Sequence, residues 1–189
     1  GLPAGPELFS LARGPDGEIW LATSQGMLAR DARAQRFVPV PGLPRTASEA
    51  FTMSADGVDL WLTERVFVER YRRSGGQWRL EDRLDAAQGL PQVEFDGIAA
   101  DRRGVLWLSS ARGLVRLDPA EKSARIYGIR DGLPGQEIIA PPILRPQDGR
   151  VIASAAHGLV IFDPSVLRPV REPPQINVES IGVQGAEGA

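Results

Sequence analysis

The chain repeats one short phrase four times, and this repeat constrains the fold more than any other feature. Each copy begins with Gly-Leu-Pro and has a glutamate a few residues later, and the copies start 41, 47 and 43 residues apart. A period of 20–50 residues is typical of folds that stack small units or arrange them in a ring. The copies are GLPAGPE from Gly1, GLPRTASE from Gly42, GLPQVE from Gly89 and GLPGQE from Gly132.

A second landmark keeps step with the first. An Asp-Gly or Arg-Gly pair is followed by a short apolar run, which holds tryptophan in three copies and Ile152 in the fourth. In the second copy Phe67 stands where the other copies have a turn glycine. The four copies are DGEIWLATSQG from Asp16, DGVDLWLTERV from Asp56, RGVLWLSSARG from Arg103 and DGRVIASAAHG from Asp148.

Each repeat contains four short segments that are typical of β-strands. An Asp-Gly pair between alternating apolar segments is a strong hairpin signal, because glycine tolerates a positive φ. In the third repeat the predicted strands are 95–100, 105–109, 113–118 and 123–128. Four strands in about 40–45 residues, with tryptophan in the second, match a propeller blade. A sandwich or barrel would not repeat both landmarks in register, and a β-helix has shorter rungs. We therefore predict an all-β protein, a β-propeller of four four-stranded blades.

Composition excludes several function classes. The 189 residues are 42% hydrophobic with a net charge of −2, so no strong field attracts nucleic acid. There is no cysteine, and His157 is the only histidine. No phosphate loop or nucleophile elbow is present. Asp118-Pro119 and Asp163-Pro164 are interpreted as turns that end strands. We expect no catalytic residue, no metal and no cofactor in this chain.

The tryptophans admit two interpretations. Trp20, Trp61 and Trp107 could form a stacking platform for sugars or bases. The favoured interpretation is that they fill the wedge between neighbouring blades, because each stands at the same place in its repeat. Trp78 lies outside that place, and we expect it to be half-exposed on an outer strand.

Taken together, these repeats resemble the two-component regulator propeller repeat. The third unit carries most of that pattern, from Gly89-Leu90-Pro91 through Trp107 to Asp118-Pro119. The fourth unit resembles the family's closing repeat, and the segment from Arg171 resembles the first strand of the Y_Y_Y-type β-sandwich that follows the propeller in this family. Departures are the missing turn glycine in unit two, the missing tryptophan in unit four and the additional Pro141-Pro142.

The resemblance implies a domain plan and a role. Residues 1–170 are expected to form the blades, divided as 1–41, 42–88, 89–131 and 132–170, and residues 171–189 a linker and the first strand of the sandwich. Because the family's usual ring has seven blades, we expect further blades upstream. The implied role is the periplasmic sensor region of a bacterial inner-membrane protein, a hybrid histidine kinase or a GGDEF-type signalling protein. Kinase or cyclase activity would lie in output domains outside this chain.

The glutamates of the repeated phrase are candidate ligand-binding residues. Each stands where the connecting loop becomes the innermost strand, so Glu7, Glu49, Glu94 and Glu137 are predicted to form an arc at one mouth of the central channel. Such an arc could hold a cation, an amine or sugar hydroxyls. The alternative is that each glutamate caps its loop or pairs with an arginine of the next blade.

The second turn of each repeat is predicted to lie on the same face. Gln25, Arg112 and His157 occupy equivalent positions there, and unit two has Val66 beside Glu64 and Arg65. These side chains differ between repeats, as a recognition surface requires and as freely varying exposed turns also allow. Histidine is the side-chain type that can act as a switch near neutral pH, so His157 is a candidate, and a solvated turn histidine is the alternative.

Three functions are compatible with these features. The first is a ligand-sensing propeller that binds a small polar molecule such as a saccharide and acts as a homodimer of the parent protein. The second is a protein-interaction or dimerisation module without a small ligand. The third is a propeller lyase, which is disfavoured because such a lyase is expected to need a metal and a histidine, and His157 is the only histidine available. Nucleic acid is not expected as a partner, and contact with a membrane is expected only through flanking segments.

Overall fold

Antiparallel β-sheets make up the regular structure of this protein. The structure, a computed structural model, describes residues 5–138, 140–145 and 148–167. Sheet A contains β1 (Leu8–Arg13), β2 (Ile19–Thr23), β3 (Gly26–Asp31) and β4 (Arg36–Pro39). Sheet B contains β5 (Ala50–Met53), β6 (Asp59–Glu64), β7 (Phe67–Ser74) and β8 (Gln77–Leu84). Sheet C contains β9 (Phe95–Ala100), β10 (Leu106–Ser110), β11 (Gly113–Asp118) and β12 (Ser123–Tyr127). Sheet D contains β13 (Ile143–Leu144), β14 (Val151–Ala155) and β15 (Gly158–Phe162).

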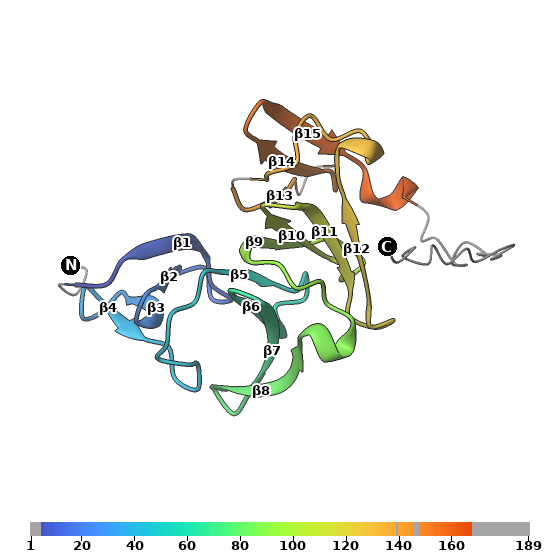
Figure 1. The fold of residues 1–189 in the computed structure, drawn as a ribbon. Helices are drawn as coiled ribbons and strands as arrows, with labels where there is room; N and C mark the ends of the chain where they lie inside the picture. The colour runs from blue at the N-terminus through green and yellow to red at the C-terminus, as the bar shows by residue number, and fades with distance from the viewer. Residues whose placement is uncertain (1–4, 139, 146–147, 168–189) are drawn as a thin grey trace, which may run out of the picture.

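In every sheet the strands pair with their neighbours in chain order. The four sheets follow one another around a shared hollow, which places them as the blades of a β-propeller (Figure 1). The first strands β1, β5, β9 and β13 lie innermost and contact one another. The predicted all-β propeller and its order of strands are therefore confirmed.

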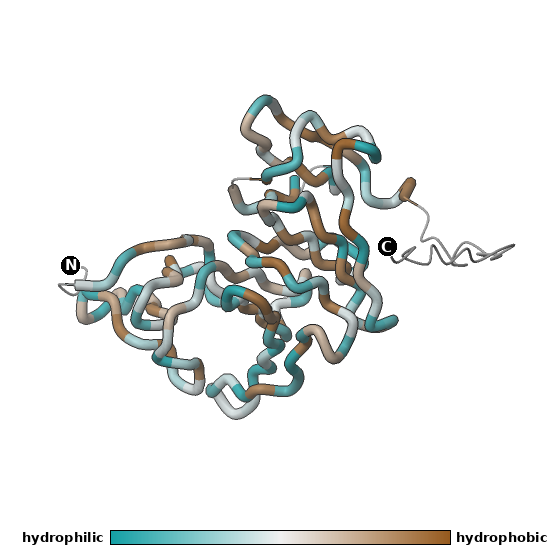
Figure 2. Tube along the Cα trace, in the orientation of Figure 1, coloured by the Kyte–Doolittle hydropathy of each residue, from teal (hydrophilic) through white to brown (hydrophobic). Residues whose placement is uncertain are grey.

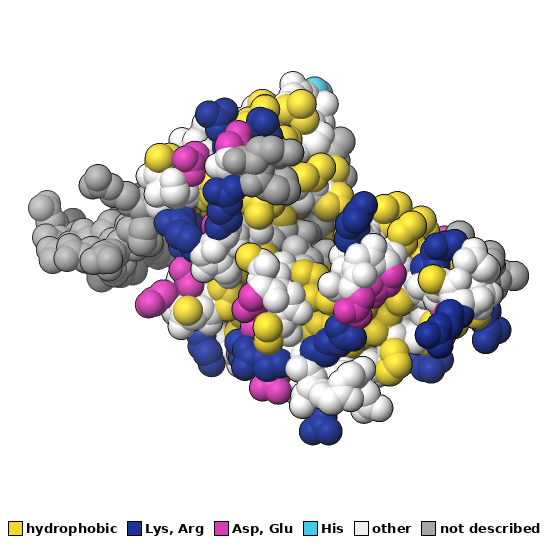
Figure 3. All heavy atoms as spheres, turned by 180° about the vertical axis from the view of Figure 1, so that it is seen from behind, with side chains coloured by type: hydrophobic (Ala, Val, Ile, Leu, Met, Phe, Trp, Pro, Cys, Tyr) yellow, Lys and Arg dark blue, Asp and Glu magenta, His cyan; other side chains and the backbone are white. Residues whose placement is uncertain are grey.

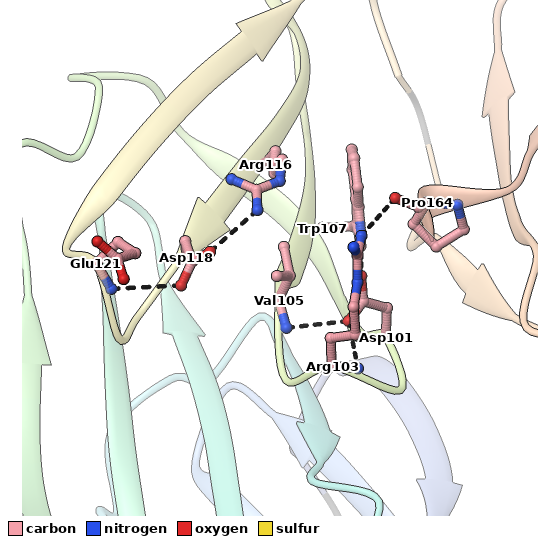
Figure 4. Close-up of polar contacts among 8 residues, drawn as sticks. All are labelled: Asp101, Arg103, Val105, Trp107, Arg116, Asp118, Glu121 and Pro164. Carbon is pink, nitrogen blue, oxygen red and sulfur yellow. Dashed lines mark hydrogen bonds and ion pairs between the residues drawn. The ribbon is translucent and has the colours of Figure 1, made fainter. Parts of the chain in front are cut away.

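The turn between β9 and β10 shows how sequence determines the local structure. Gly104 has a φ of +78°, in the left-handed region that glycine adopts without strain. The carboxylate of Asp101 accepts the backbone N–H groups of Arg103 at 2.8 Å and Val105 at 3.1 Å. It also accepts the indole N–H of Trp107 at 3.3 Å (Figure 4). One buried side chain thus holds the turn and orients the tryptophan of the next strand.

The Gly-Leu-Pro phrase carries the chain from the outer strand of one sheet toward the inner strand of the next. Its glycine at position 42 has a φ of +86°, and a Cβ there would lie 2.0 Å from the carbonyl oxygen of Trp78. The leucines of three copies, Leu43, Leu90 and Leu133, are buried in three successive cores. The phrase therefore recurs because each junction between sheets needs the same bend and the same apolar anchor.

Three hydrophobic cores lie between neighbouring sheets, one at each junction. Trp20 belongs to the core between sheets A and B, Trp61 to the core between B and C, and Trp107 to the core between C and D. All three tryptophans are buried. Hydrophobic stretches run along the strands and hydrophilic ones along the turns (Figure 2). The prediction that these rings fill the wedges between blades is confirmed, so they form no open stacking platform.

The prediction for Trp78 was wrong. Trp78 is on β8, an outer strand as expected, but its exposed fraction is only 3%. Its ring packs edge-on against Trp20 of sheet A, with ring centroids 5.9 Å apart. The pairing of β8 with β7 turns this side chain toward the neighbouring sheet, and sequence position alone did not reveal that contact.

The fourth sheet also differs from expectation. Within the described residues it has three strands rather than four, and its inner strand is short. Ile138 pairs with Ala155 in an isolated bridge, and Pro141 and Pro142 precede β13. Proline cannot donate a ladder hydrogen bond, which accounts for the interruption of the inner strand. The segment from Arg171, predicted to start a sandwich, lies outside the described residues.

No helix within the described ranges is long and apolar enough to cross a membrane.

Candidate binding face

The four glutamates of the repeated phrase occupy equivalent places in the fold. Glu7, Glu49 and Glu94 directly precede the inner strands β1, β5 and β9. Glu137 directly precedes Ile138, the residue that pairs with β14 in an isolated bridge. The structure thus places all four where the connecting loop reaches the innermost strand.

The turns between second and third strands lie beside these glutamates. The backbone N–H of Ser24 donates to the carbonyl of Glu7 at 3.0 Å, and the N–H of Glu7 donates to Ser24 Oγ at 2.9 Å. In sheet B the N–H of Glu49 donates to the carbonyl of Thr63 at 3.0 Å. Glutamates and second turns therefore share one face, which we call the turn face.

Backbone hydrogen bonds at the turn face connect each sheet to the one before it. Ser48 N–H donates to the carbonyl of Thr23 at 3.1 Å, which links sheet B to sheet A. Phe95 N–H donates to the carbonyl of Arg65 at 2.7 Å, and Ile138 N–H to that of Ser110 at 3.0 Å. The loops are thus held by main-chain groups next to the glutamates, which leaves the carboxylates free for other contacts.

Only one of the four carboxylates has a side-chain partner among the described residues. Glu94 forms an ion pair with Arg65, and both side chains are largely exposed. Arg65 belongs to the preceding sheet, whereas the sequence alternative had expected an arginine of the next blade. Glu7 and Glu137 are exposed and Glu49 is half-buried. Pairing with an arginine, the alternative to ligand binding, therefore applies to Glu94. The other three carboxylates have no side-chain partner in the described part of the chain.

The turn residues Gln25 and Arg112 are held in the same way. Thr23 Oγ1 donates to the carbonyl of Gly26 at 2.7 Å and accepts the N–H of Gln25 at 3.1 Å. In sheet C, Ser110 Oγ donates to the carbonyl of Gly113 and accepts the N–H of Arg112 at 3.2 Å. These contacts fix the backbone and leave both side chains exposed.

The remaining turns differ in detail. The side chain of His157, in the turn between β14 and β15, is exposed as well. In sheet B the turn residue Arg65 adopts a φ of +38°, which a non-glycine residue rarely adopts. Its neighbour Glu64 accepts a hydrogen bond from Thr46 Oγ1 at 3.2 Å. The turn face thus carries different polar side chains on a repeated backbone frame.

Sequence reasoning missed Asp96 on this face. The pairing of β9 with β10 shifts between Ser109 and Ser110, so Asp96 is an additional residue that bulges from the inner strand. Burial raises the pKa of Asp96, and the negative charges of Glu94 and Glu137 raise it further. Acidic side chains of sheets C and D are therefore close enough for their negative charges to interact. A charged residue within an otherwise apolar inner strand was the signal that could have identified it.

A second group of acidic side chains surrounds Glu64, near the junction of sheets A and B. Burial raises the pKa of Glu64, the hydrogen bond from Thr46 lowers it, and the charges of Glu69 and Glu49 raise it. Within the described ranges, no group of three or more His, Cys, Asp and Glu side chains is placed to hold a metal ion.

The inner strands enclose a hollow of about 790 Å³. Its wall comes from β1, β5, β9 and the segment around β13, and Ser10 and Thr52 are its polar residues. None of the four glutamates lines it. The wall of the hollow therefore offers few hydrogen-bonding side chains.

No family model matches the chain, and no curated protein matches it. Solved structures do match. The extracellular domain assigned to a hybrid two-component system of B. thetaiotaomicron is 19% identical over 87% of this chain, with a TM-score of 0.64. A second domain of this kind from the same organism is 15% identical over 84% of the chain, with a TM-score of 0.62. The resemblance noted in the repeats is thus confirmed at the level of the fold.

The matches also include enzymes. A gluconolactonase from Xanthomonas campestris is 18% identical over 84% of this chain and 59% of its own length, with a TM-score of 0.56. At such identities the likeness shows the fold alone. The chain spans about a fifth of the two B. thetaiotaomicron domains, 23% and 22% of their lengths.

Proposed function

We propose that this chain is part of an extracytoplasmic sensor region of a bacterial two-component or diguanylate-cyclase signalling protein, located in the periplasm. The observation that carries the proposal is the propeller shared with two extracellular domains of hybrid two-component systems over more than four-fifths of the chain. The repeat pattern, which resembles the two-component regulator propeller, supports it independently. In this proposal any kinase or cyclase activity belongs to the parent protein.

The ligand in this proposal is a small polar molecule such as a saccharide, bound at the turn face. Three features support this location. The first is a set of three carboxylates with no side-chain partner in the described part of the chain, those of Glu7, Glu49 and Glu137. The second is a set of exposed turn side chains of different polarity, those of Gln25, Arg112 and His157. The third is Asp96, which adds a further acidic group beside Glu94 and Glu137. Carboxylates accept hydrogen bonds from sugar hydroxyls, and side-chain amides both accept and donate them.

Titration calorimetry with a panel of oligosaccharides tests this proposal on the chain. Glu7→Gln and Glu137→Gln remove charge from the turn face without breaking an ion pair in the described part of the chain. Glu121→Gln, between β11 and β12, is the matched control because that turn lies on the opposite face. We expect the turn-face variants to weaken binding at least about tenfold and the control to leave it unchanged. No binding across the panel, or equal binding by all variants, would contradict the proposed site.

A dimerisation module without a small ligand is the alternative. In that case sedimentation would show a tight homodimer of the parent ectodomain, while Glu7→Gln and Glu137→Gln would change neither assembly nor signalling.

A further inference from the structure

A second hollow, of about 520 Å³, lies on the turn face where sheets B and C meet, and we call it the B–C hollow. One residue of its wall comes from the turn between β6 and β7, and the others come from the loop that leads from β8 to β9. The wall consists of Val66, Asp85, Ala86, Gln92, Val93 and Glu94. A hollow of this size can hold a small organic molecule, and its wall offers apolar and hydrogen-bonding groups together.

The B–C hollow has a counterpart at the junction of sheets C and D, because the loops follow the same repeat. Asp85 and Gly128 each stand four residues before the glycine of the repeated phrase, and each is followed by one turn of 3-10 helix. Val66 is the second residue of its turn, as Arg112 is in the turn of sheet C. Gly128 and Arg112 therefore mark the place at the junction of C and D that corresponds to the B–C hollow.

At the junction of sheets C and D this place is filled by a side-chain amide. A Cβ at Gly128 would lie 3.5 Å from Oε1 of Gln136, so the amide of Gln136 lies over Gly128. Nε2 of Gln136 donates to the carbonyl of Arg112 at 2.8 Å. One carboxamide group therefore bridges the loop and the turn.

At the junction of sheets A and B the main chain fills the place instead. The copy of the repeated phrase is two residues longer there than in the two copies that follow. A Cβ at Gly26, where the turn of sheet A ends, would lie 2.3 Å from the carbonyl oxygen of Pro44, so the loop packs directly on the turn. The junction of B and C lacks the longer loop. It also lacks the bridging amide, because Val93 stands at the position of Gln136 and packs into the core.

The groups around the B–C hollow complement those of a carboxamide. The carbonyl of Val66 corresponds to the carbonyl that Gln136 reaches, and it accepts no hydrogen bond from the described residues. Asp85 stands in place of a glycine and adds a carboxylate, of which Oδ1 accepts the N–H of Ala87 at 2.8 Å and Oδ2 has no partner in the described part. The amide of Gln92 is exposed. A group with two N–H donors and one carbonyl oxygen can pair with all three.

From these observations we infer that the B–C hollow binds a small molecule that carries a carboxamide group, as the side chain of glutamine does. The NH2 group of the ligand donates to the Val66 carbonyl and to the Asp85 carboxylate, and its oxygen accepts an N–H of Gln92. The aliphatic part of the ligand lies on Ala86 and Val93. A carboxylate in place of the amide has no hydrogen to donate and is repelled by Asp85. The inference depends on neither the sensor role nor a saccharide ligand.

Chemical-shift titration of the full chain with glutamine tests this inference. Glutamate is the matched probe, because it differs only in the side-chain amide, and lysine tests whether an ammonium group serves as well. We expect glutamine to shift the backbone resonances of Val66, Ala86 and Gln92 and to bind at least about tenfold more tightly than either other probe. Absence of these shifts, or binding of glutamate or lysine that is as tight, would overturn the inference.

Two exposed valines of sheet B separate the B–C hollow from the rest of the surface. Val66→Phe places a larger side chain in the hollow, at a residue that is 45% exposed. Val58→Phe makes the same change at a residue that is 42% exposed, in the turn between β5 and β6 on the opposite face. Only Val66→Phe is expected to weaken glutamine binding, by at least about tenfold. Equal binding by the two variants would contradict the proposed location.

Gln136→Ala provides a test by gain of binding. This variant removes the amide that fills the corresponding place between sheets C and D. We expect it to bind a second glutamine, seen as shifts at Arg112 and Gly128 that are absent from the wild-type titration. If no such shifts appear, this place in the repeat does not recognise a carboxamide, and the inference fails.

Discussion

Asp101 is the buried residue on which the turn between β9 and β10 depends. Its exposed fraction is 2%, and it accepts three hydrogen bonds, from two backbone N–H groups and the Trp107 indole. Asp101→Ala leaves these donors without their partner, so we expect a loss of about 2–4 kcal/mol in the free energy of unfolding. Urea denaturation measures it.

Asp56→Ala provides the matched control for Asp101. Asp56 also accepts a backbone N–H in the first turn of its sheet, from Val58 at 3.0 Å, but it is exposed to water. Its replacement is expected to lower stability clearly less than Asp101→Ala does, because water can replace the carboxylate as a hydrogen-bond partner. Equal losses for the two variants would show that burial of Asp101 contributes nothing.

Asp96 predicts an effect of pH on stability. Its pKa is raised above the ordinary 3.8 by burial and by Glu94 and Glu137, so the folded chain holds this proton to higher pH than the unfolded chain does. Stability from this group is therefore complete below 3.8 and is lost as pH rises through the higher folded pKa. Asp96→Asn removes that loss. We expect a higher urea midpoint than wild type at pH 7 and a difference that shrinks as pH falls toward 4.

The environment of single residues was predicted correctly where the repeat is regular, and wrongly where contacts with a neighbouring strand or sheet determine it. Trp20, Trp61 and Trp107 share one place in the repeat, so their burial followed from the sequence. Trp78 has no counterpart in the other repeats, and only its contact with Trp20 explains its burial. Asp96 was missed because a bulge turns it outward, and that bulge arises from the pairing of β9 with β10.

Among the structural elements, the Gly-Leu-Pro bend can be tested directly through the packing of its glycine against β8. Gly42 and Gly57 both have positive φ values, +86° and +70°. A Cβ at Gly42 would meet the Trp78 backbone at 2.0 Å, whereas one at Gly57 would meet nothing within 4 Å. Gly57→Ala should therefore lower stability by about 1–2 kcal/mol through backbone strain alone. Gly42→Ala should lower it clearly more, by about 3 kcal/mol or above, because β8 must also shift.

The comparison of urea midpoints for these two variants isolates the contact, since the strain at φ is common to both. If Gly42→Ala were no worse than Gly57→Ala, the bend would not be packed against β8 as described.

Strand positions in the regular repeats were predictable within one or two residues. The third repeat predicted strands at 95–100, 105–109, 113–118 and 123–128, and the structure has Phe95–Ala100, Leu106–Ser110, Gly113–Asp118 and Ser123–Tyr127. Alternation and turn chemistry are local, so they can be read from sequence. The fourth repeat was predicted less well, because Pro141 and Pro142 break the inner strand and shorten β13 to two residues.

At the scale of the whole molecule, sheet D presents an apolar face with no partner in the described chain. Leu159 and Ile161 of β15 are 67% and 52% exposed, and they face away from the core that contains Val160. Hydrophobic side chains also reach the surface among charged ones elsewhere (Figure 3). Exposed apolar sheet faces promote association. We expect Leu159→Lys with Ile161→Lys to reduce concentration-dependent light scattering several-fold without lowering the urea midpoint.

The control for this double variant adds the same charge elsewhere. Glu121→Lys changes the net charge by the same amount, two units, at an exposed turn. Should it reduce scattering equally, the effect would come from net charge rather than from the apolar face.

The sequence was sufficient to predict the all-β propeller, its strand order and the burial of the tryptophans that recur in the repeat. Those features depend on alternation, turn residues and a repeat, which are local and periodic. The folded structure shows which carboxylates have partners, why Trp78 is buried and that Asp96 lies at the turn face. These depend on contacts between residues of different sheets, such as Arg65 with Glu94, and packing across a junction leaves no pattern within a single repeat.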